Sequence, residues 1–239
     1  MNNLEKYKLN NYEFIKFTYG NANFIFSTSK NNLNFNVNLE EGKSNLMMLK
    51  SMFNLKEIGY LKQIHSNLVY NYDGEIHQGD GLITNRRNVG VGVFTADCVP
   101  ILIYDSVNEV IVAVHSGWKG TLNEICINAL SKLKSEYGSK MKDLSAVIGP
   151  HNRGCCYEVG DDLKVLFSEK ELYKDLEIIK DNKLDLEKCI IKQLETNGVK
   201  SENIISTNIC TYCTSDYNMY SYRKQKEECG RMFSFVYLT

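Results

Sequence analysis

The residues of this chain whose types and spacing suggest chemistry lie around two apolar runs, Val99 to Tyr104 and Val110 to Val114. Both runs are rich in β-branched residues, and turn-forming residues separate them, which is typical of a β-hairpin. A hairpin loop over Asp105 to Asn108 places Cys98 directly opposite His115. A thiol and an imidazole are therefore expected to meet across two strands.

Cys98 and His115 in that register are close enough to share a metal ion. Opposed side chains on one face have Cβ atoms about 4.5 to 5.5 Å apart, and sulfur and imidazole nitrogen are preferred zinc ligands. A shift of one residue would turn the two side chains to opposite faces, and Pro100 cannot donate to the ladder. The structural alternative is that Cys98 packs as a small apolar residue and His115 is a hydrogen-bonded residue at a strand end.

The segment after the hairpin is a candidate anion site. Thr121 and Glu124 match the T-x-x-E pattern of a capping box, which predicts a helix from there to about Gly138. Ser116 to Gly120 then lies at a helix N-terminus, where free N–H groups and the helix dipole favour phosphate, and Lys119 adds positive charge. A plain helix start that binds only water is the alternative.

The amino-acid composition of the chain excludes some classes of binding partner. The chain has 28 basic and 29 acidic residues, and its net charge of -1 gives no global field that attracts nucleic acid or an anionic membrane. Its N-terminus lacks the apolar segment of a signal peptide, and no stretch approaches the roughly 20 apolar residues of a membrane span. We expect a cytoplasmic protein whose eight cysteines are thiols, metal ligands or a nucleophile rather than disulfides.

No linker or repeat divides the sequence, and we predict a single domain over residues 1–239. Strand-like and helix-like segments alternate without the regular βαβ period. This favours an α+β fold, a layered sandwich with mixed β-sheets, over a doubly wound fold. The predicted strands include Asn23 to Thr28, Leu144 to Ile148 and Met232 to Leu238, and the predicted helices include Ser44 to Leu55 and Asp185 to Asn197, with Asp185 as N-cap.

Three further histidines are possible ligands. His65 lies in an interrupted strand next to Ser66, and His151 follows a Gly-Pro pair and could line a pocket. His77 lies in an acidic, glycine-rich loop and is expected at the surface.

The remaining cysteines compete for the same roles. Cys210 and Cys213 have the C-x-x-C spacing of half a zinc site or of a redox pair. No second such pair occurs, and the adjacent Cys155 and Cys156 have the wrong spacing to complete a zinc ribbon. We therefore expect Cys210 and Cys213 to serve in packing.

Six ordered blocks, from about residue 24 to the C-terminus, resemble those of a known family. It is the laccase-domain family, formerly named multicopper polyphenol oxidases and now regarded as zinc-dependent purine nucleoside phosphorylases with adenosine deaminase activity. The blocks are Gln63-Ile64-His65, Asp80 to Thr84, Thr95 to Pro100, His115 to Gly120, Ile148 to Pro150 with Cys156 to Gly160, and Ser221 to Arg223 with Gly230-Arg231.

The resemblance implies that His65, Cys98 and His115 hold one Zn²⁺, with copper as the less favoured metal. Zinc with an open position lowers the pKa of bound water toward about 7, which suits attack on C6 of adenosine. Asp97, next to a ligand, is then either a proton shuttle or a residue that holds a ligand in place. The implied fold is a layered sandwich related to the catalytic domain of cytotoxic necrotizing factor toxins.

The resemblance also implies the substrates, which are phosphate and the nucleosides adenosine, inosine, guanosine and methylthioadenosine. Lys119 and Arg223 are the expected phosphate contacts, although Arg223 could equally be a structural ion-pair partner. No nucleic-acid or membrane partner is expected, and the sequence leaves the choice between monomer and homodimer open. Ser29 stands where the family commonly has an arginine, and Lys30 offers only a point charge in its place.

Other functions fit parts of the same pattern. A copper phenol oxidase follows from the older family name, but multicopper oxidation normally needs many more than the four histidines present. A metal-free cysteine hydrolase would use Cys98 as nucleophile and His115 as base. A non-enzymatic module would bind zinc without turning over a nucleoside.

Overall fold

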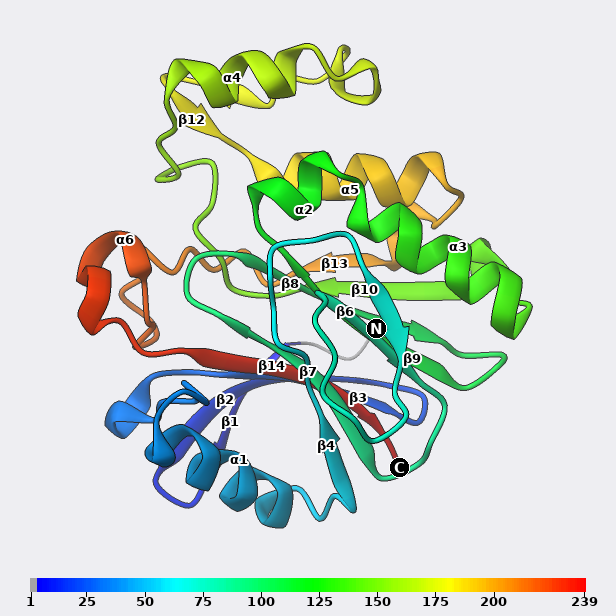
Figure 1. Ribbon diagram of the computed structural model, residues 1–239, viewed down its shortest axis with the longest axis vertical. Coiled ribbons are helices and arrows are strands. Elements are labelled where there is room, and N and C mark those ends of the chain that lie inside the picture. The colour runs from blue at the N-terminus through cyan, green and yellow to red at the C-terminus, as the bar shows by residue number, and fades with distance from the viewer. Residues whose placement is uncertain (1–3) are drawn as a thin grey trace.

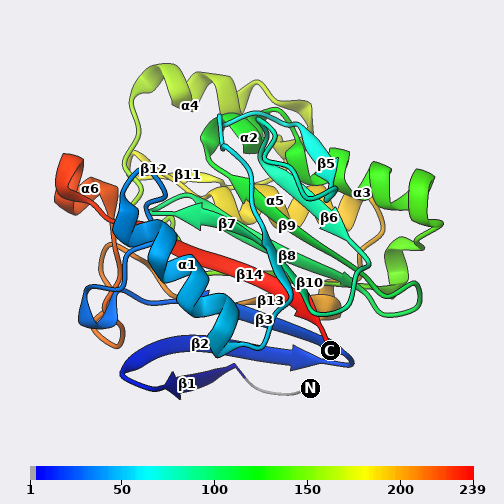
Figure 2. The ribbon, with the colours of Figure 1, turned by 60° about the horizontal axis from the view of Figure 1, so that its bottom comes forward.

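The computed structural model describes residues 4–239, and its elements form four layers (Figure 1). Two six-stranded mixed sheets pack face to face. Helix α1 (Glu40–Met52) covers the outer face of the first sheet, and helices α3 (Ile125–Tyr137) and α5 (Leu186–Thr196) cover the outer face of the second (Figures 1 and 2). The predicted α+β sandwich with mixed sheets is confirmed, whereas a single domain and the likeness to a toxin domain stay predictions.

The first sheet has the strand order β1-β2-β3-β14-β7-β4 and contains both ends of the described chain. Strand β14 pairs antiparallel with β3 and β7, and all of its residues are buried, which explains its almost continuous apolar sequence. The strands of this sheet are β1 (Glu5–Leu9), β2 (Tyr12–Tyr19), β3 (Ala22–Ser27), β4 (Glu57–Gly59), β7 (Val89–Thr95) and β14 (Met232–Leu238).

The second sheet has the order β13-β10-β8-β9-β6-β5, with the predicted hairpin β8-β9 at its centre. Every residue of β8 and β9 is buried, between α3 and α5 on one side and the first sheet on the other. The strands of this sheet are β5 (Val69–Asn71), β6 (Gly81–Thr84), β8 (Val99–Asp105), β9 (Val110–Ser116), β10 (Leu144–Ile148) and β13 (Ile204–Ser206).

The register of the hairpin corrects the prediction. Asp105 pairs with Val110, so Pro100 and not Cys98 lies opposite His115. The same pairing, continued past the end of β8, would place Gly117 opposite Cys98. Gly117 is two residues beyond His115, and residues two apart share a face of the sheet. Cys98 and His115 therefore remain on one face although they are not directly opposed.

Side-chain bonds in the loop explain this register. The carboxylate of Asp105 accepts hydrogen bonds from the backbone N–H groups of Val107 and Asn108, at 2.9 and 3.0 Å. These bonds form a turn whose last residue, Glu109, has a positive φ of 52°. Asp105 thus ends the strand, and the loop begins one residue later than predicted.

The helix after the hairpin is divided into α2 (Trp118–Leu122) and α3, which corrects the predicted single helix. Thr121 lies inside α2, and its hydroxyl donates to the carbonyl oxygen of Gly117 at 3.0 Å. Glu124 precedes α3 with a φ of 60° and makes no side-chain cap. The prediction of a capping box is therefore wrong, because the Thr121 hydroxyl donates its hydrogen bond to the start of its own short helix.

The other helices lie around the second sheet and its connections. The predicted cap of α5 is confirmed, since Asp185 accepts a hydrogen bond from the backbone N–H of Lys188 at 3.1 Å. Within residues 4–239, no helix has both the length and the apolar character that a membrane crossing requires. The remaining α-helices and strands are α4 (Asp161–Ser168), α6 (Tyr222–Gln225) and the hairpin β11 (Ile179–Lys180) with β12 (Lys183–Leu184).

Three apolar clusters fill the three interfaces between the layers. The central cluster joins the two sheets and includes Phe24, Phe26 and Leu102. Full burial of each such side chain contributes about 1.5 to 3 kcal/mol. Two of these clusters contain residues of β8 and β9, so the residues at the ends of the two strands are positioned by a packed core.

Candidate metal centre

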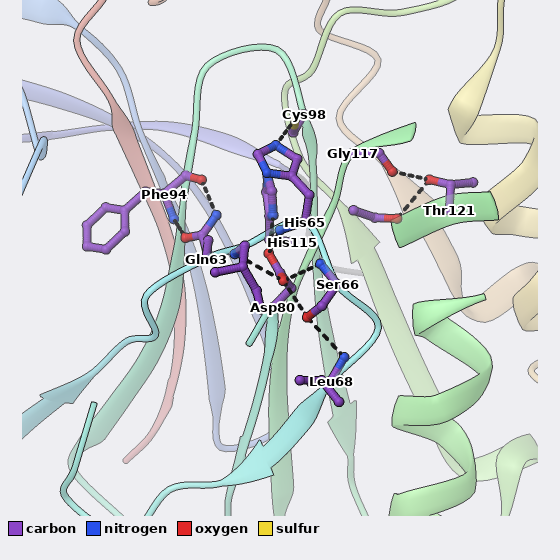
Figure 3. Close-up of polar contacts among 12 residues, drawn as sticks. Gln63, His65, Ser66, Leu68, Asp80, Phe94, Cys98, His115, Gly117 and Thr121 are labelled. Atoms are coloured by element: carbon purple, nitrogen blue, oxygen red, sulfur yellow. Dashed lines mark hydrogen bonds and ion pairs between the residues drawn. The ribbon is translucent and has the colours of Figure 1, made fainter. Parts of the chain in front are cut away.

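His65, Cys98 and His115 converge where β8 begins and β9 ends (Figure 3). Their candidate ligand atoms all lie within 4.8 Å of one another. Nε2 of His65 is 3.9 Å from Sγ of Cys98, and tetrahedral zinc with bonds of about 2.3 and 2.1 Å holds sulfur and nitrogen about 3.6 Å apart. The structure thus brings the three expected ligands together at a spacing that a metal ion can fill.

The three side chains come from different segments. His115 belongs to β9, Cys98 lies in the turn between β7 and β8, and His65 lies in the loop between β4 and β5 with a φ of 57°. Gly117 permits their approach, because a Cβ atom there would lie 3.0 Å from Cδ2 of His65 and 3.1 Å from Sγ of Cys98. Any larger residue at position 117 would press on two of the three ligands.

Asp80, just before β6, supports two of these ligands. Its fully buried carboxylate accepts hydrogen bonds from Nδ1 of His115 at 2.8 Å and from the backbone N–H groups of His65 and Ser66 at 3.1 and 2.6 Å (Figure 3). With Nδ1 bonded to the carboxylate, His115 has its Nε2 free for a metal. A carboxylate of this kind commonly fixes the ring of a metal-binding histidine.

The sequence patterns assign no role to Asp80 beyond a turn residue within a family block. An aspartate between two glycines, just before the apolar pair Leu82-Ile83, was the available signal. Its importance depends on the pairing of β6 with β9, which places residue 80 beside His115. That pairing is a long-range contact that local patterns do not reveal.

Gln63 fastens the loop that contains His65. Its side-chain Nε2 donates to the carbonyl oxygen of Phe94 at 2.8 Å, and its Oε1 accepts from the backbone N–H of Phe94 at 2.7 Å. The amide thus pairs with the edge of β7 as a neighbouring strand would. This contact limits the movement of His65 relative to the first sheet.

The titratable groups of the centre are strongly coupled. Burial alone would raise the pKa of Cys98, but the adjacent His115 and His65 lower it to about 6. Burial would lower the pKa of His115, whereas the charge of Cys98 and the bond to Asp80 raise it to about 9. The metal-free pair is therefore a thiolate beside an imidazolium, and the imidazolium must lose its proton when a metal binds.

Asp97 contacts neighbouring loops rather than a ligand side chain. Its Oδ1 accepts a hydrogen bond from Oγ1 of Thr211 at 2.6 Å, and its Oδ2 accepts one from the backbone N–H of Arg223 at 2.7 Å. The residue has a φ of 89°, a strained conformation for aspartate. Both carboxylate oxygens therefore hold protein segments, and neither holds the side chain of His65, Cys98 or His115.

The centre opens into a cavity of about 730 Å³, within the size range of small-molecule sites. Aromatic rings line it, and burial together with the nearby Cys98 raises the pKa of one of them, Tyr157, to about 12. Three cationic side chains also line it, namely Lys62, Arg223 and Arg231. The guanidinium of Arg223 lies 5.0 Å from the centre of the Tyr157 ring. A smaller hollow of about 480 Å³ adjoins the cavity at Trp118, Tyr157 and Arg223.

The structure brings Arg223 but not Lys119 to this cavity. Lys119 is exposed, and its ammonium lies 5.5 Å from the centre of the Trp118 ring, outside the cavity lining. Helix α2, at which the anion was expected to bind, has only five residues. Lys30 is likewise exposed and does not line the cavity. Arg231, to which the sequence patterns assign no role, is the second arginine of the lining.

The other histidines lie outside this group of ligands. His77 lies at the surface as expected, where its ring stacks on Tyr70 and its Nε2 is 2.8 Å from Oδ2 of Asp73. His151 is buried, with its Nδ1 2.8 Å from the carbonyl oxygen of Gly149. Neither ring joins the group formed by His65, Cys98 and His115.

Residues 19–239 match the model of a family described as multi-copper polyphenol oxidoreductase laccase. The chain belongs to this family. A relative of this laccase-like chain in Clostridium acetobutylicum, named purine nucleoside phosphorylase, is 49% identical over 231 residues, which cover 96% of the chain and 97% of the relative. A protein of the same name in Borreliella burgdorferi is 37% identical over 179 residues, 72% of the chain and 76% of the relative.

Solved structures of two bacterial proteins share the fold. The hypothetical protein YfiH of Bacillus licheniformis has a TM-score of 0.88 and 24% identity, with coverage of 97% of this chain and 98% of that one. YlmD of Geobacillus stearothermophilus has a TM-score of 0.86 and 21% identity, with 99% of both chains covered. These matches support the two-sheet architecture described above.

Proposed function

We propose that the chain is a zinc-dependent purine nucleoside enzyme, which cleaves nucleosides with phosphate and deaminates adenosine by hydrolysis. The observation on which this rests is the convergence of His65, Cys98 and His115 at a cavity lined by aromatic rings and arginines. The names of the relatives in Clostridium acetobutylicum and Borreliella burgdorferi support the substrate class.

The donor set suits zinc. Imidazole and thiolate are both zinc ligands, and three protein ligands leave one position open, as in catalytic zinc sites. When bound, zinc supplies Lewis acidity and activates a water molecule. Asp80 holds His115 in the tautomer that presents Nε2, and His115 and His65 keep Cys98 in its thiolate form. The chain's own residues therefore orient His115 and ionise Cys98 before the ion arrives, and His115 gives up a proton when the ion binds.

The aromatic side chains suit a purine. Stacking of a base on an aromatic ring contributes about 1 to 3 kcal/mol per base and tolerates differences among bases. Such a surface would accept adenosine, inosine, guanosine and methylthioadenosine, which differ at the purine C2 or C6 or at the 5′ group. The rings available in the cavity lining are Phe35, Phe94, Trp118, Tyr157 and Tyr222.

Arg223 and Arg231 are our proposed phosphate contacts, because guanidinium groups bind phosphate oxygens in pairs. In phosphorolysis a phosphate oxygen attacks C1′ of the ribose, and the purine leaves with the electrons of the C–N bond. The arginines bind and orient the anion for this attack. In deamination, water adds at C6 and ammonia leaves, so that reaction needs no phosphate. Such an enzyme would act in the cytoplasm, where its free thiols remain reduced.

A metal-free cysteine hydrolase is the second candidate, and one observation favours it. The pKa of about 6 at Cys98 and of about 9 at His115 describe a thiolate–imidazolium pair, the usual state of a cysteine nucleophile. A copper oxidase has weaker support. Multicopper oxidation normally needs many histidines, and His77 and His151 lie apart from His65, Cys98 and His115.

Turnover measured on protein of known metal content separates these functions. Zinc-loaded protein should convert adenosine to inosine, and inosine plus phosphate to hypoxanthine, and chelation should abolish both reactions until zinc returns. Cys98→Ala should be inactive, whereas the control Cys126→Ala, at a buried core residue of α3, should retain both activities. Activity that survives complete chelation would favour the hydrolase, and oxygen uptake with a phenol after copper loading would favour the oxidase.

A further inference from the structure

Four cysteines outside the cavity form a second cluster of possible ligands. The sulfur atoms of Cys155, Cys156, Cys210 and Cys213 all lie within 4.8 Å of one another. Cys210 is buried, but Cys213 and Cys155 are exposed. Exposure of Cys213 contradicts the expectation that both members of the C-x-x-C pair serve in packing.

The sulfur spacing matches a tetrahedral thiolate site. Sγ of Cys155 is 3.8 Å from Sγ of Cys213. Four sulfurs at about 2.3 Å from one zinc ion lie about 3.8 Å from each other, whereas a disulfide holds two sulfurs about 2.05 Å apart. This pair therefore has the separation expected in a four-cysteine metal site, and no pair of the four exceeds 4.8 Å.

Two chain segments, far apart in the sequence, supply these sulfurs. The adjacent pair lies in a turn after β10, and the C-x-x-C pair lies in a turn closed by a hydrogen bond from the backbone N–H of Thr214 to the carbonyl oxygen of Cys210, at 3.0 Å. The segments are joined by a bond from the N–H of Thr211 to the carbonyl oxygen of His151, at 2.9 Å. The fold thus supplies the second pair of sulfurs that sequence spacing alone does not predict.

Backbone groups also approach the most buried of the four sulfurs. The backbone N–H groups of Arg153, Tyr212 and Cys213 face Sγ of Cys210 as hydrogen-bond donors. Such N–H groups stabilise a thiolate in the way that surrounding donors support metal ligands.

We propose that Cys155, Cys156, Cys210 and Cys213 bind a structural zinc ion, separate from the centre at His65, Cys98 and His115. Four thiolates complete the tetrahedral coordination and leave no open position for water, so this ion has a structural role. On binding, the metal replaces the protons of the thiols, which pass to solvent. The exposure of Cys155 and Cys213 gives the ion a path from solvent.

The site lies where it can stabilise the wall of the cavity. Thr211, inside the C-x-x-C turn, donates from its hydroxyl to Asp97 at 2.6 Å, and Asp97 adjoins the ligand Cys98. Tyr157, the residue after Cys156, lines the cavity. A zinc ion at the four cysteines therefore holds two cavity residues in place without touching the substrate.

Metal content of purified variants tests the proposal directly. The unaltered chain should contain about two zinc ions, and Cys98→Ala should retain about one. Cys213→Ser should also retain about one, and so should Cys155→Ser. Both residues are exposed, so serine there should not prevent folding. The matched control Cys126→Ala, a lone buried cysteine, should keep two.

Cobalt substitution identifies which site is lost, independently of enzymatic activity. Each cobalt–thiolate bond contributes to a sulfur-to-metal charge-transfer absorption. Most of this absorption should be lost in Cys213→Ser, whereas Cys98→Ala, which removes the single thiolate of the other centre, should keep most of it. Zinc content that falls to zero in Cys98→Ala would overturn the proposal, as would a disulfide detected by mass between these cysteines or iron in place of zinc. A chain with two zinc ions that turns over no nucleoside would refute the proposed function and leave this site intact.

Discussion

The carboxylate of Asp80 and the imidazole of His115 are joined by a hydrogen bond of 2.8 Å between Oδ1 and Nδ1. The same carboxylate accepts from the backbone N–H of His65 at 3.1 Å. One buried carboxylate therefore fixes His115 on a strand and His65 on a loop with respect to each other. This arrangement explains how a loop residue is placed as accurately as a residue of the central hairpin.

Asp80→Asn should weaken zinc binding at the three-ligand centre by about 10- to 100-fold, the usual effect of losing such a support. Asparagine cannot accept all the hydrogen bonds that the carboxylate accepts, so His115 loses its fixed tautomer and orientation. Competition with a chromophoric chelator measures the affinity. Asp73→Asn is the matched control, because Asp73 lies 2.8 Å from His77 in an exposed pair. Equal affinity in both variants would contradict the assigned role of Asp80.

Asp80 should also contribute to the free energy of unfolding of the metal-free protein, in a way that depends on pH. Burial would raise its pKa, but the bonds from His115 and Ser66 lower it below the usual 3.8. The unfolded chain therefore takes up this proton first as pH falls, so the stabilisation is complete above pH 3.8 and is lost as pH falls through the folded pKa. Urea unfolding of chelated protein between pH 7 and pH 3 should show a shallower acid decline in Asp80→Asn, and an unchanged decline would contradict this contribution.

Cys98 should react as a thiolate in metal-free protein. Its pKa of about 6 predicts that alkylation by iodoacetamide rises to a plateau through pH 6. Zinc should suppress the reaction, because it occupies the sulfur. Cys126, whose pKa burial raises to about 12, should stay unmodified in the folded protein. A midpoint for Cys98 above pH 8 would show that the two histidines do not stabilise the thiolate.

Arg223→Gln should raise the KM for phosphate by roughly 10- to 100-fold, the loss expected for a hydrogen bond to a charged group. Deamination of adenosine should change little, since that reaction needs no phosphate. The backbone N–H that bonds Asp97 is unaffected by the substitution. Lys119→Gln serves as the control, because Lys119 does not line the cavity. A larger effect at Lys119 than at Arg223 would restore the anion site first expected from the sequence.

The central hairpin shows how far local patterns predict this structure. Its strands and the closing strand β14 follow from runs of β-branched and aromatic residues. The register of the hairpin does not follow from these runs. It depends on the turn, in which the Asp105 carboxylate accepts hydrogen bonds from the backbone N–H groups of Val107 and Asn108. Cys98 and His115 are nevertheless close, as predicted. The observed register differs from the predicted one, but it leaves both side chains on the same face of the sheet.

Other features depend on contacts between distant residues. Asp80 and Arg231 acquire their places through pairing with strands far away in the sequence. The four-cysteine cluster joins residues separated by more than fifty positions, so spacing along the chain argued against it. The hairpin β1-β2 follows a local pattern, an Asn-Asn turn with Asn10 at a φ of 54°, and was within reach of sequence reasoning.

The most direct test of the three-ligand centre is an anomalous difference map, recorded at the zinc absorption edge from crystals of the zinc-loaded chain. The map should show a peak about 2.0 to 2.3 Å from Sγ of Cys98 and from a ring nitrogen of both His65 and His115. A fully loaded crystal without a peak at that point would contradict the metal centre and the chemistry proposed from it.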